Sequence, residues 1–274
     1  SGSDAAVAGG VTAVFEMPNT KPSTTEAEAL ADKLKRAKGR MLCDHAFFMG
    51  AADNAAHLAE LETLPGCCGV KVFMGSSTGT LLVEDDKALL AVLKAGRRRV
   101  AIHAEDEPRL KERKAIADKS GDVADHPNWR DVETALNATR RVLALAREAH
   151  RPVHVLHITT AEEMELLAQS KDIATVEVTP QHLTLAAPDC YKRIGTLAQM
   201  NPPIREARHR EALWRALRSG IVDVLGSDHA PHTREEKEQP YPASPSGMPG
   251  VETMLPLMLS HAIAGRLSLA RIVD

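Results

Sequence analysis

The chain alternates between short apolar runs and longer amphipathic segments along almost its whole length. The runs that predict strands are Val11–Met17, Met41–Met49, Gly69–Met74, Val100–Ala104, Val153–Ile158, Thr175–Thr179 and Val222–Ser227. The segments that predict helices are Thr25–Ala37, Asn54–Thr63, Asp85–Ala95, Val132–Ala149, Ala161–Gln169, Glu206–Ser219 and Val251–Ala264. Regular alternation of strand and helix indicates an α/β fold with a parallel sheet, and strands that are apolar throughout indicate burial on both faces.

The seven strand–helix units favour a barrel over an open sheet. A (β/α)8 TIM-type barrel needs eight strands and about 250 residues, and this chain has 274 residues but opens on a helical segment at Ser1–Ala8. We therefore predict an incomplete barrel without its first strand, with residues 1–274 forming one domain from strands 2 to 8. The alternative, a doubly wound open sheet, favours a Gly-rich turn after its first strand, and Met17–Thr20 is no such turn.

Two segments interrupt the alternation, and both follow a predicted strand. Glu105–Arg130 is strongly charged and predicts a long loop with a short helix, whereas Glu235–Gly250 is rich in Pro and Gly and predicts an ordered loop. Because a barrel builds its active site from the loops after its strands, both segments are expected on the catalytic face.

Composition excludes several classes of partner. Lys plus Arg number 34 against 37 Asp plus Glu, a formal net charge of −3, which argues against nucleic-acid binding. No apolar run approaches the roughly 18 residues of a membrane span. The four cysteines, Cys43, Cys67, Cys68 and Cys190, lack zinc-ribbon spacing, so we expect reduced thiols and a cytoplasmic protein.

Polar side chains follow the predicted strands at the end where a barrel carries its chemistry. Lys71, His103, His157 and Asp228 come from four different strands, and imidazole and carboxylate are natural ligands of zinc. His154 lies three residues before His157, so alternation along a strand lets only one of them face the interior. We predict that His157 does and that His154 is a packed or hydrogen-bonded residue.

Several of these residues have more than one interpretation. Lys71 lies among apolar neighbours, where an ammonium is costly; it either pairs with a carboxylate or is covalently carboxylated. Asp228 is a helix cap or a metal ligand that also accepts a proton from metal-bound water. Asn19, Asn201 and Gly247 are turn residues or substrate-binding residues.

Five motifs, taken in order, resemble those of the dihydroorotase family, which are metal-dependent cyclic amidohydrolases. The motifs are Met17–Thr20, Gly69–Gly79, Ile102–Asp106, Asn201–Arg205 and Ser227–Thr233. The last is also similar to a motif of allantoinases and hydantoinases, whereas Met17–Thr20 and Asn201–Pro203 favour dihydroorotase.

The resemblance implies a distorted barrel that holds two divalent metal ions, usually Zn2+. It implies that Lys71 is a carboxylated bridging ligand, although some dihydroorotases bridge with an aspartate. His103 and His157 are implied ligands of the more exposed metal and Asp228 of the buried one. The implied substrate-binding groups are Asn19, Asn201, His232 and the backbone around Gly247.

The activity implied is reversible hydrolysis of L-dihydroorotate to N-carbamoyl-L-aspartate in pyrimidine biosynthesis. A metal-activated hydroxide would attack the ring amide, and Asp228 would pass its proton to the leaving nitrogen. The partners expected are the small-molecule substrate and a second copy in a homodimer, with no nucleic acid and no membrane.

The family also has a first-strand His-x-His pair, a following Arg and a C-terminal β-sandwich segment that this sequence does not contain. We therefore expect a fragment of a longer enzyme, inactive by itself. The alternatives are a hydantoinase or allantoinase, and a non-catalytic homologue that binds aspartate transcarbamoylase.

Overall fold

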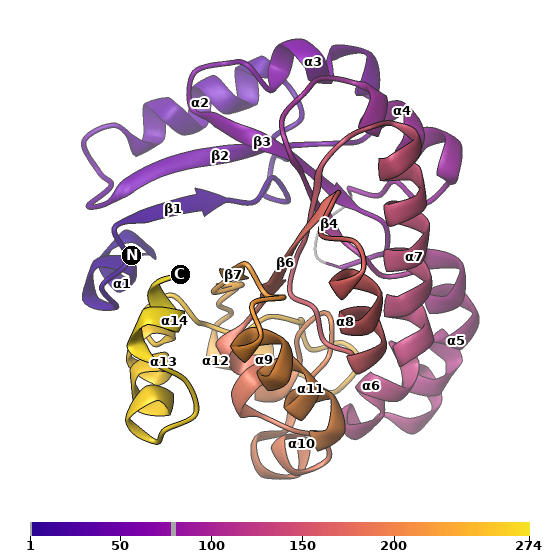
Figure 1. The fold of residues 1–274 in the computed structure, drawn as a ribbon, viewed down its shortest axis with the longest axis vertical. Coiled ribbons are helices and arrows are strands. Elements are labelled where there is room, and N and C mark those ends of the chain that lie inside the picture. Colours follow the sequence, from indigo (N-terminus) through magenta and orange to yellow (C-terminus); the bar gives the residue numbers. More distant parts are fainter. Residues whose placement is uncertain (1, 78–80) are drawn as a thin grey trace.

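The computed structural model describes residues 2–77 and 81–274, and its centre is a parallel sheet whose seven strands lie in sequence order (Figure 1). The strands are β1 (Ala13–Glu16), β2 (Asp44–Gly50), β3 (Cys67–Phe73), β4 (Val100–His103), β5 (Val153–Val155), β6 (Ala174–Val178) and β7 (Val224–Leu225). All seven predicted strands are confirmed, most of them shorter than the apolar runs. The sheet curls into a partial TIM barrel, with β1 and β7 as its edges.

The helices surround this sheet, and several of them cover its outer face (Figure 1). They are α1 (Gly2–Ala8), α2 (Ala27–Ala37), α3 (Leu58–Leu61), α4 (Asp86–Lys94), α5 (Glu107–Ser120), α6 (His126–Trp129), α7 (Val132–Glu148), α8 (Ala161–Ala168), α9 (Pro180–Thr184), α10 (Asp189–Ile194), α11 (Ala207–Arg218), α12 (Arg234–Lys237), α13 (Met254–Ile263) and α14 (Leu269–Val273). Short 3-10 turns are η1 (Ala55–His57), η2 (Val123–Asp125) and η3 (Gly195–Ala198). The helix predicted over residues 54–63 is thus divided into η1 and α3.

The strand register separates an apolar outer face from a polar inner face. One row across β3 to β6 is Val70, Val100, Val153 and Ala174, all buried in the main core against the helices. The adjacent row is Lys71, Ala101, His154 and Thr175. Because neighbouring residues of a strand point to opposite faces, this second row faces the barrel interior.

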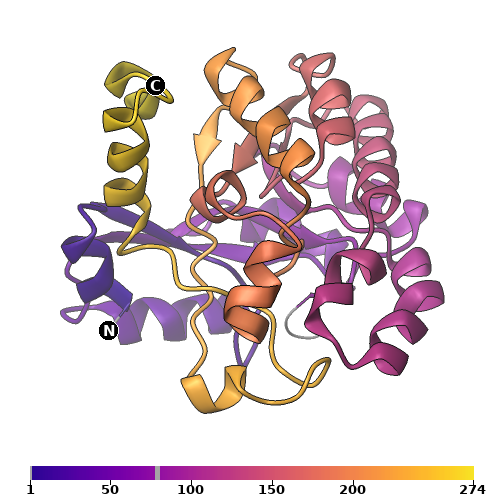
Figure 2. The ribbon, with the colours of Figure 1, turned by 90° about the horizontal axis from the view of Figure 1, so that it is seen from below.

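A second, smaller core lies beyond the carboxyl ends of the strands. Its members are Ala117, Val123, Cys190, Tyr191, Ala198, Met200, Ile204 and Tyr241. They come from α5, η2, α10, η3 and the segments around them, which lie together below the sheet in Figure 2. This core fixes the long connections that surround the candidate site.

The prediction for Glu105–Arg130 was wrong in extent, because the segment holds the 14-residue helix α5 as well as η2 and α6. The signals were present: the Asp106 side chain accepts from the Arg109 N–H at 3.3 Å, Pro108 lies in the first turn, and Gly121 ends the helix at φ 62°. Such caps mark the two ends of a helix even where its sequence has no clear amphipathic pattern. Glu235–Gly250 is an ordered loop after the single turn α12.

Within the described ranges, no helix has the length and apolar character that a membrane span requires.

Candidate active site

The four predicted metal ligands lie at the carboxyl ends of strands that meet at one edge of the sheet. Lys71 is in β3, His103 is the last residue of β4, and His157 follows β5 by two residues. Asp228 follows β7 by three residues. Since all seven strands run parallel, these positions share the catalytic face of a barrel.

His103 and His157 face one another inside the barrel. His103 Nδ1 lies 3.2 Å from His157 Nε2, and the side chains are only 1% and 5% exposed. Burial lowers the pKa of both imidazoles, and nearby charges lower that of His157 further. Glu105 Oε2 lies 3.0 Å from His103 Nε2. A proton held there by the carboxylate leaves the His103 Nδ1 lone pair directed at His157.

This pair has the geometry of two ligands of one metal ion. Two nitrogens, each about 2.0–2.1 Å from a tetrahedral zinc, lie about 3.3 Å apart. The other ring nitrogen of a metal-bound histidine usually forms a hydrogen bond with a carboxylate, and His103 Nε2 has such a partner in Glu105. His157 Nδ1, in contrast, is buried with no partner in the described ranges. Among those residues no three His, Cys, Asp or Glu groups form a metal cluster by themselves.

Lys71 and Asp228 lie close enough to affect one another's charge. Burial lowers the pKa of Lys71, while Asp228 and Glu177 oppose that shift. Burial and the charge of Glu177 raise the pKa of Asp228, which Lys71 opposes. The Lys71 Nζ lies over the Phe73 ring, 4.4 Å from its centroid. Both groups are thereby shifted toward their neutral forms, which suits a group that exchanges protons near neutral pH.

Two of the four predicted ligands have unusual backbone conformations. Only three non-glycine residues in the described ranges have positive φ: His150, His157 at 38° and Asp228 at 41°. His150 directly follows a helix, where such a conformation is common. The other two have no such explanation, and strained positions of this kind concentrate at functional sites.

His154 also faces the interior, so the argument that only one of the two histidines could do so was wrong. Strand β5 ends at Val155 and the chain then turns through His157, so the alternation does not extend to His157. His154 is hydrogen-bonded as predicted, through Nδ1 to Thr175 Oγ1 at 2.8 Å and through Nε2 to Glu177 at 3.3 Å.

Sequence reasoning missed Glu177. It accepts the His157 backbone N–H at 3.1 Å, contacts His154, and acts electrostatically on Lys71 and Asp228. A side chain at Gly226 would collide with its carboxylate, since a Cβ there would lie 2.3 Å from Glu177 Cδ. The available signal was a single carboxylate within the apolar strand 174–178, at the inward-facing parity.

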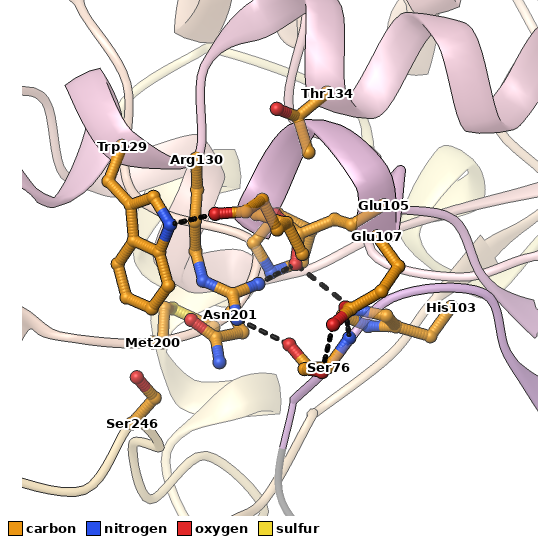
Figure 3. A network of polar contacts seen from close by, with 12 residues as sticks. Ser76, His103, Glu105, Glu107, Trp129, Arg130, Thr134, Met200, Asn201 and Ser246 are labelled. Atoms are coloured by element: carbon orange, nitrogen blue, oxygen red, sulfur yellow. Dashed lines mark hydrogen bonds and ion pairs between the residues drawn. The ribbon is translucent and has the colours of Figure 1, made fainter. Parts of the chain in front are cut away.

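A second missed group surrounds Glu105 (Figure 3). Glu105 is fully buried and pairs with the Arg130 guanidinium, which also donates to the Ser76 carbonyl and stacks on Trp129. Burial raises the pKa of Glu105, but Arg130 and His103 together lower it to about 2. Glu105 is therefore an anion with a fixed orientation that holds His103 in place.

The predicted substrate-binding residues occupy loops on the same edge. Asn19 follows β1, and Asn201 is half-buried with Oδ1 3.0 Å from His126 Nε2. His232 Nε2 lies 3.2 Å from the Ser246 carbonyl, beside Gly247. The Gly247 N–H donates to the Gln199 carbonyl at 2.9 Å, so this N–H is not available to a ligand in this conformation. Thr78 and Gly79 of the Gly69–Gly79 motif lie outside the described residues.

His229 has a structural role. Its Nδ1 accepts the backbone N–H groups of Gly250 and Val251 at 3.1 and 3.3 Å. Gln181 donates to the Ser227 carbonyl at 2.9 Å. These bonds hold the chain on both sides of Asp228.

Known proteins similar to this chain are cyclic amidohydrolases, although no protein-family model matches the sequence. Dihydroorotases of Methanosarcina acetivorans and Halobacterium salinarum are 35% and 36% identical over the whole chain. An L-hydantoinase of Paenarthrobacter aurescens is 33% identical over 99% of it. The chain spans 61–64% of the length of these relatives.

Solved structures agree in fold. The L-hydantoinase (dihydropyrimidinase) of Arthrobacter aurescens superposes with a TM-score of 0.93 at 32% identity, covering 99% of this chain and 63% of that one. The dihydropyrimidinase of Brevibacillus agri gives 0.88 at 26% identity, covering 100% and 63%. Similarity along the full chain, in both sequence and fold, therefore shows that it belongs to the dihydroorotase/hydantoinase family of cyclic amidohydrolases.

Proposed function

We propose that this chain is the catalytic barrel of a dihydroorotase, which hydrolyses L-dihydroorotate reversibly to N-carbamoyl-L-aspartate in pyrimidine biosynthesis. The observation that carries the proposal is the pair of facing nitrogens of His103 and His157, 3.2 Å apart. Lys71 and Asp228 complete the set at the same edge. The motifs Met17–Thr20 and Asn201–Pro203 favour dihydroorotate over other cyclic amides.

The side chains have distinct roles in this proposal. His103 and His157 would hold the more exposed of two divalent metals, Zn2+ in our proposal, and Asp228 would hold the buried one. Bound metal supplies a Lewis acid and an activated water. Asp228 accepts the proton of the attacking water and delivers it to the ring nitrogen that leaves; its raised pKa suits both steps. Asn19, Asn201 and His232 bind the polar groups of the substrate.

In its carboxylated form, Lys71 would be a further ligand, shared by the two metals. Its lowered pKa increases the share of neutral amine, whose nitrogen attacks the carbon of CO2 and releases one proton as the carbamate forms. The carbamate carries a negative charge close to the carboxylates of Glu177 and Asp228. Metal ions would be needed there to balance these negative charges. A carbamate carbon signal in the NMR spectrum after 13C-bicarbonate is added would be expected in the wild type and lost in Lys71→Arg.

The test is turnover of L-dihydroorotate by the full-length protein, with and without a chelator. We expect N-carbamoyl-L-aspartate to form, activity to disappear on chelation, and Zn2+ to restore it. Absence of turnover with zinc and bicarbonate supplied would contradict the proposal.

A hydantoinase is the second candidate, favoured by the TM-score of 0.93 with an L-hydantoinase structure. The chemistry at the metals is the same, and the substrate loops decide which ring binds. Hydantoin or allantoin turnover without dihydroorotate turnover would select this candidate. Loss of every activity, with binding to aspartate transcarbamoylase, would select a non-catalytic partner.

A further inference from the structure

Lys237, the last residue of α12, has an unusual environment for a lysine. It is only 4% exposed, and no carboxylate lies within 4.0 Å of its ammonium in the described part of the chain. Its Nζ instead donates to three backbone carbonyls, those of Gln199 at 2.9 Å, Pro245 at 2.8 Å and Gly247 at 3.0 Å. An ammonium has three donors and no acceptor, so all three are satisfied.

The three carbonyls belong to two segments that are distant in sequence. Pro245 and Gly247 are in the 238–250 loop, the residues between α12 and the turn before α13. Gln199 lies two residues before Asn201. Gln199 also donates from Nε2 to the Ser244 carbonyl at 2.8 Å, and its carbonyl accepts the Gly247 N–H at 2.9 Å. Lys237 therefore lies at the junction of the two segments.

The bonds at this junction hold residues that lie on the substrate side of the proposed active site. Gly247 has φ 145°, and a Cβ there would lie 2.4 Å from the Ala230 carbonyl oxygen. The loop thus packs directly against the segment between Asp228 and His232, and the Ser246 carbonyl contacts His232. The loop has no strand or helix of its own after α12. The Met248 carbonyl, which accepts the Ala230 N–H at 3.0 Å, adds one backbone bond between the loop and the segment that follows Asp228.

A neutral side chain could not replace the ammonium without loss. Three buried or half-buried carbonyls converge on one point; without the ammonium, those of Pro245 and Gly247 would lose this donor, whereas the Gln199 carbonyl would keep the Gly247 N–H. Charge-assisted bonds are roughly twice as strong as neutral ones. Burial lowers the pKa of Lys237 to about 8, so the ammonium form still predominates at neutral pH.

We propose that Lys237 is a positioning residue, whose ammonium joins the 238–250 loop to the Gln199–Asn201 segment and thereby shapes the substrate side of the active site. The substrate part of this inference rests on the proposed function. Lys237 itself contacts none of the four predicted metal ligands, and its contact with Gly247 is with the backbone carbonyl.

The test compares Lys237→Met, which removes every donor, with Lys237→Gln, which keeps two, in the full-length, zinc-loaded protein. We expect KM for L-dihydroorotate to rise roughly tenfold or more in Lys237→Met and less in Lys237→Gln. We expect kcat to change less than threefold and zinc content to stay constant. The exposed Lys192→Met is the matched control and is expected to equal the wild type.

Hydrogen exchange separates this inference from the proposed function. Protection of the Gly247 amide should fall roughly tenfold in Lys237→Met, with or without substrate turnover. Unchanged protection in both variants would overturn the inference, and so would lost protection with an unchanged KM. A wild type that does not turn over dihydroorotate would refute the proposed function alone, because the exchange result still decides whether Lys237 fixes the loop.

Discussion

Asp228 combines a shifted pKa with an unusual backbone conformation. Its side chain is shifted toward the protonated form by burial and Glu177, and its backbone has a left-handed conformation. Neighbouring bonds from His229 and Gln181 fix that conformation. Such a residue is costly for folding and is retained where its exact placement matters for function.

Replacing Asp228 by Asn keeps the shape but removes the base. We expect kcat for dihydroorotate to fall at least a hundredfold, since general-base catalysis contributes about 10²–10⁴. The circular dichroism spectrum and thermal midpoint should stay near those of the wild type. Asp118→Asn, on the exposed face of α5, is the control, and turnover of Asp228→Asn at the wild-type rate would contradict the assignment.

Glu105 supports a second residue-scale prediction. Glu105→Gln keeps an acceptor for His103 but loses the charge that pairs with Arg130. Loss of an outer partner of a metal-bound histidine costs about 10–100-fold in metal affinity, so we expect zinc to bind that much more weakly in a chelator competition. Glu107→Gln is the matched control, because Glu107 is equally buried but bonds to Ser76 rather than to a histidine.

At the scale of elements, the strands could be predicted from sequence and most helix positions with them. Strands buried on both faces are continuous apolar runs, so their signal is strong. The length of α5 was underestimated because its polar residues are spread over all its faces, and only its caps mark its ends. Predicted strand ends were displaced because apolar runs continue past the last ladder hydrogen bond, as at Val155.

The residues of the candidate site also divide into those that the sequence predicts and those that it does not. The sequence places Lys71 within an apolar strand, and the other three predicted ligands at or just after the end of one. Their common position at one edge of the sheet could therefore be predicted, and their role as ligands stays a prediction. Glu177 and Lys237 could not be predicted, because their importance depends on contacts between segments far apart in sequence. Pairing of this kind is visible only after the chain has folded.

Asp131 links two helices and makes stability depend on pH. It caps α7 through the Thr134 N–H at 3.0 Å and pairs with Arg109 and Arg113 of α5. Burial raises its pKa, but Arg109, Thr134 and Arg113 lower it to about 2, below the ordinary 3.8. A depressed carboxyl pKa stabilises the fold above pH 3.8, and this contribution disappears as pH falls through about 2.

We therefore expect Asp131→Asn to lose about 2 kcal/mol of unfolding free energy at pH 7, since Asn still caps the helix. The difference from wild type should shrink between pH 4 and 2. Urea unfolding at a series of pH values measures it. Asp172→Asn, which breaks only an exposed ion pair, serves as the reference, and a pH-independent difference would exclude the proposed cause.

At the scale of the molecule, large apolar side chains are exposed at the β1 edge of the sheet. Phe15 of β1 is 61% exposed, and Leu42 near the start of β2 is 62% exposed. A cavity of about 790 Å³ lies beside them, lined in part by Val7, Met41 and His45. Exposed strand edges with apolar side chains are templates for pairing with another chain.

The 274-residue chain by itself is expected to self-associate as its concentration rises. Phe15→Lys places a charge on the edge strand and should shift the sedimentation profile toward the monomer at equal concentration. Lys33→Met, which removes the charge that pairs with Glu16 of the same strand, should shift it the other way. Profiles that do not respond to either substitution would show that this edge does not mediate association.

The sequential order of the strands, in which each strand from β2 to β7 pairs with its predecessor, bears on how the protein is made. Each strand that leaves the ribosome finds the neighbour that precedes it in the sequence already synthesised. The sheet can therefore grow one strand at a time in step with translation, which proceeds at about 5–20 residues per second. Of the four predicted metal ligands, Asp228 is synthesised last.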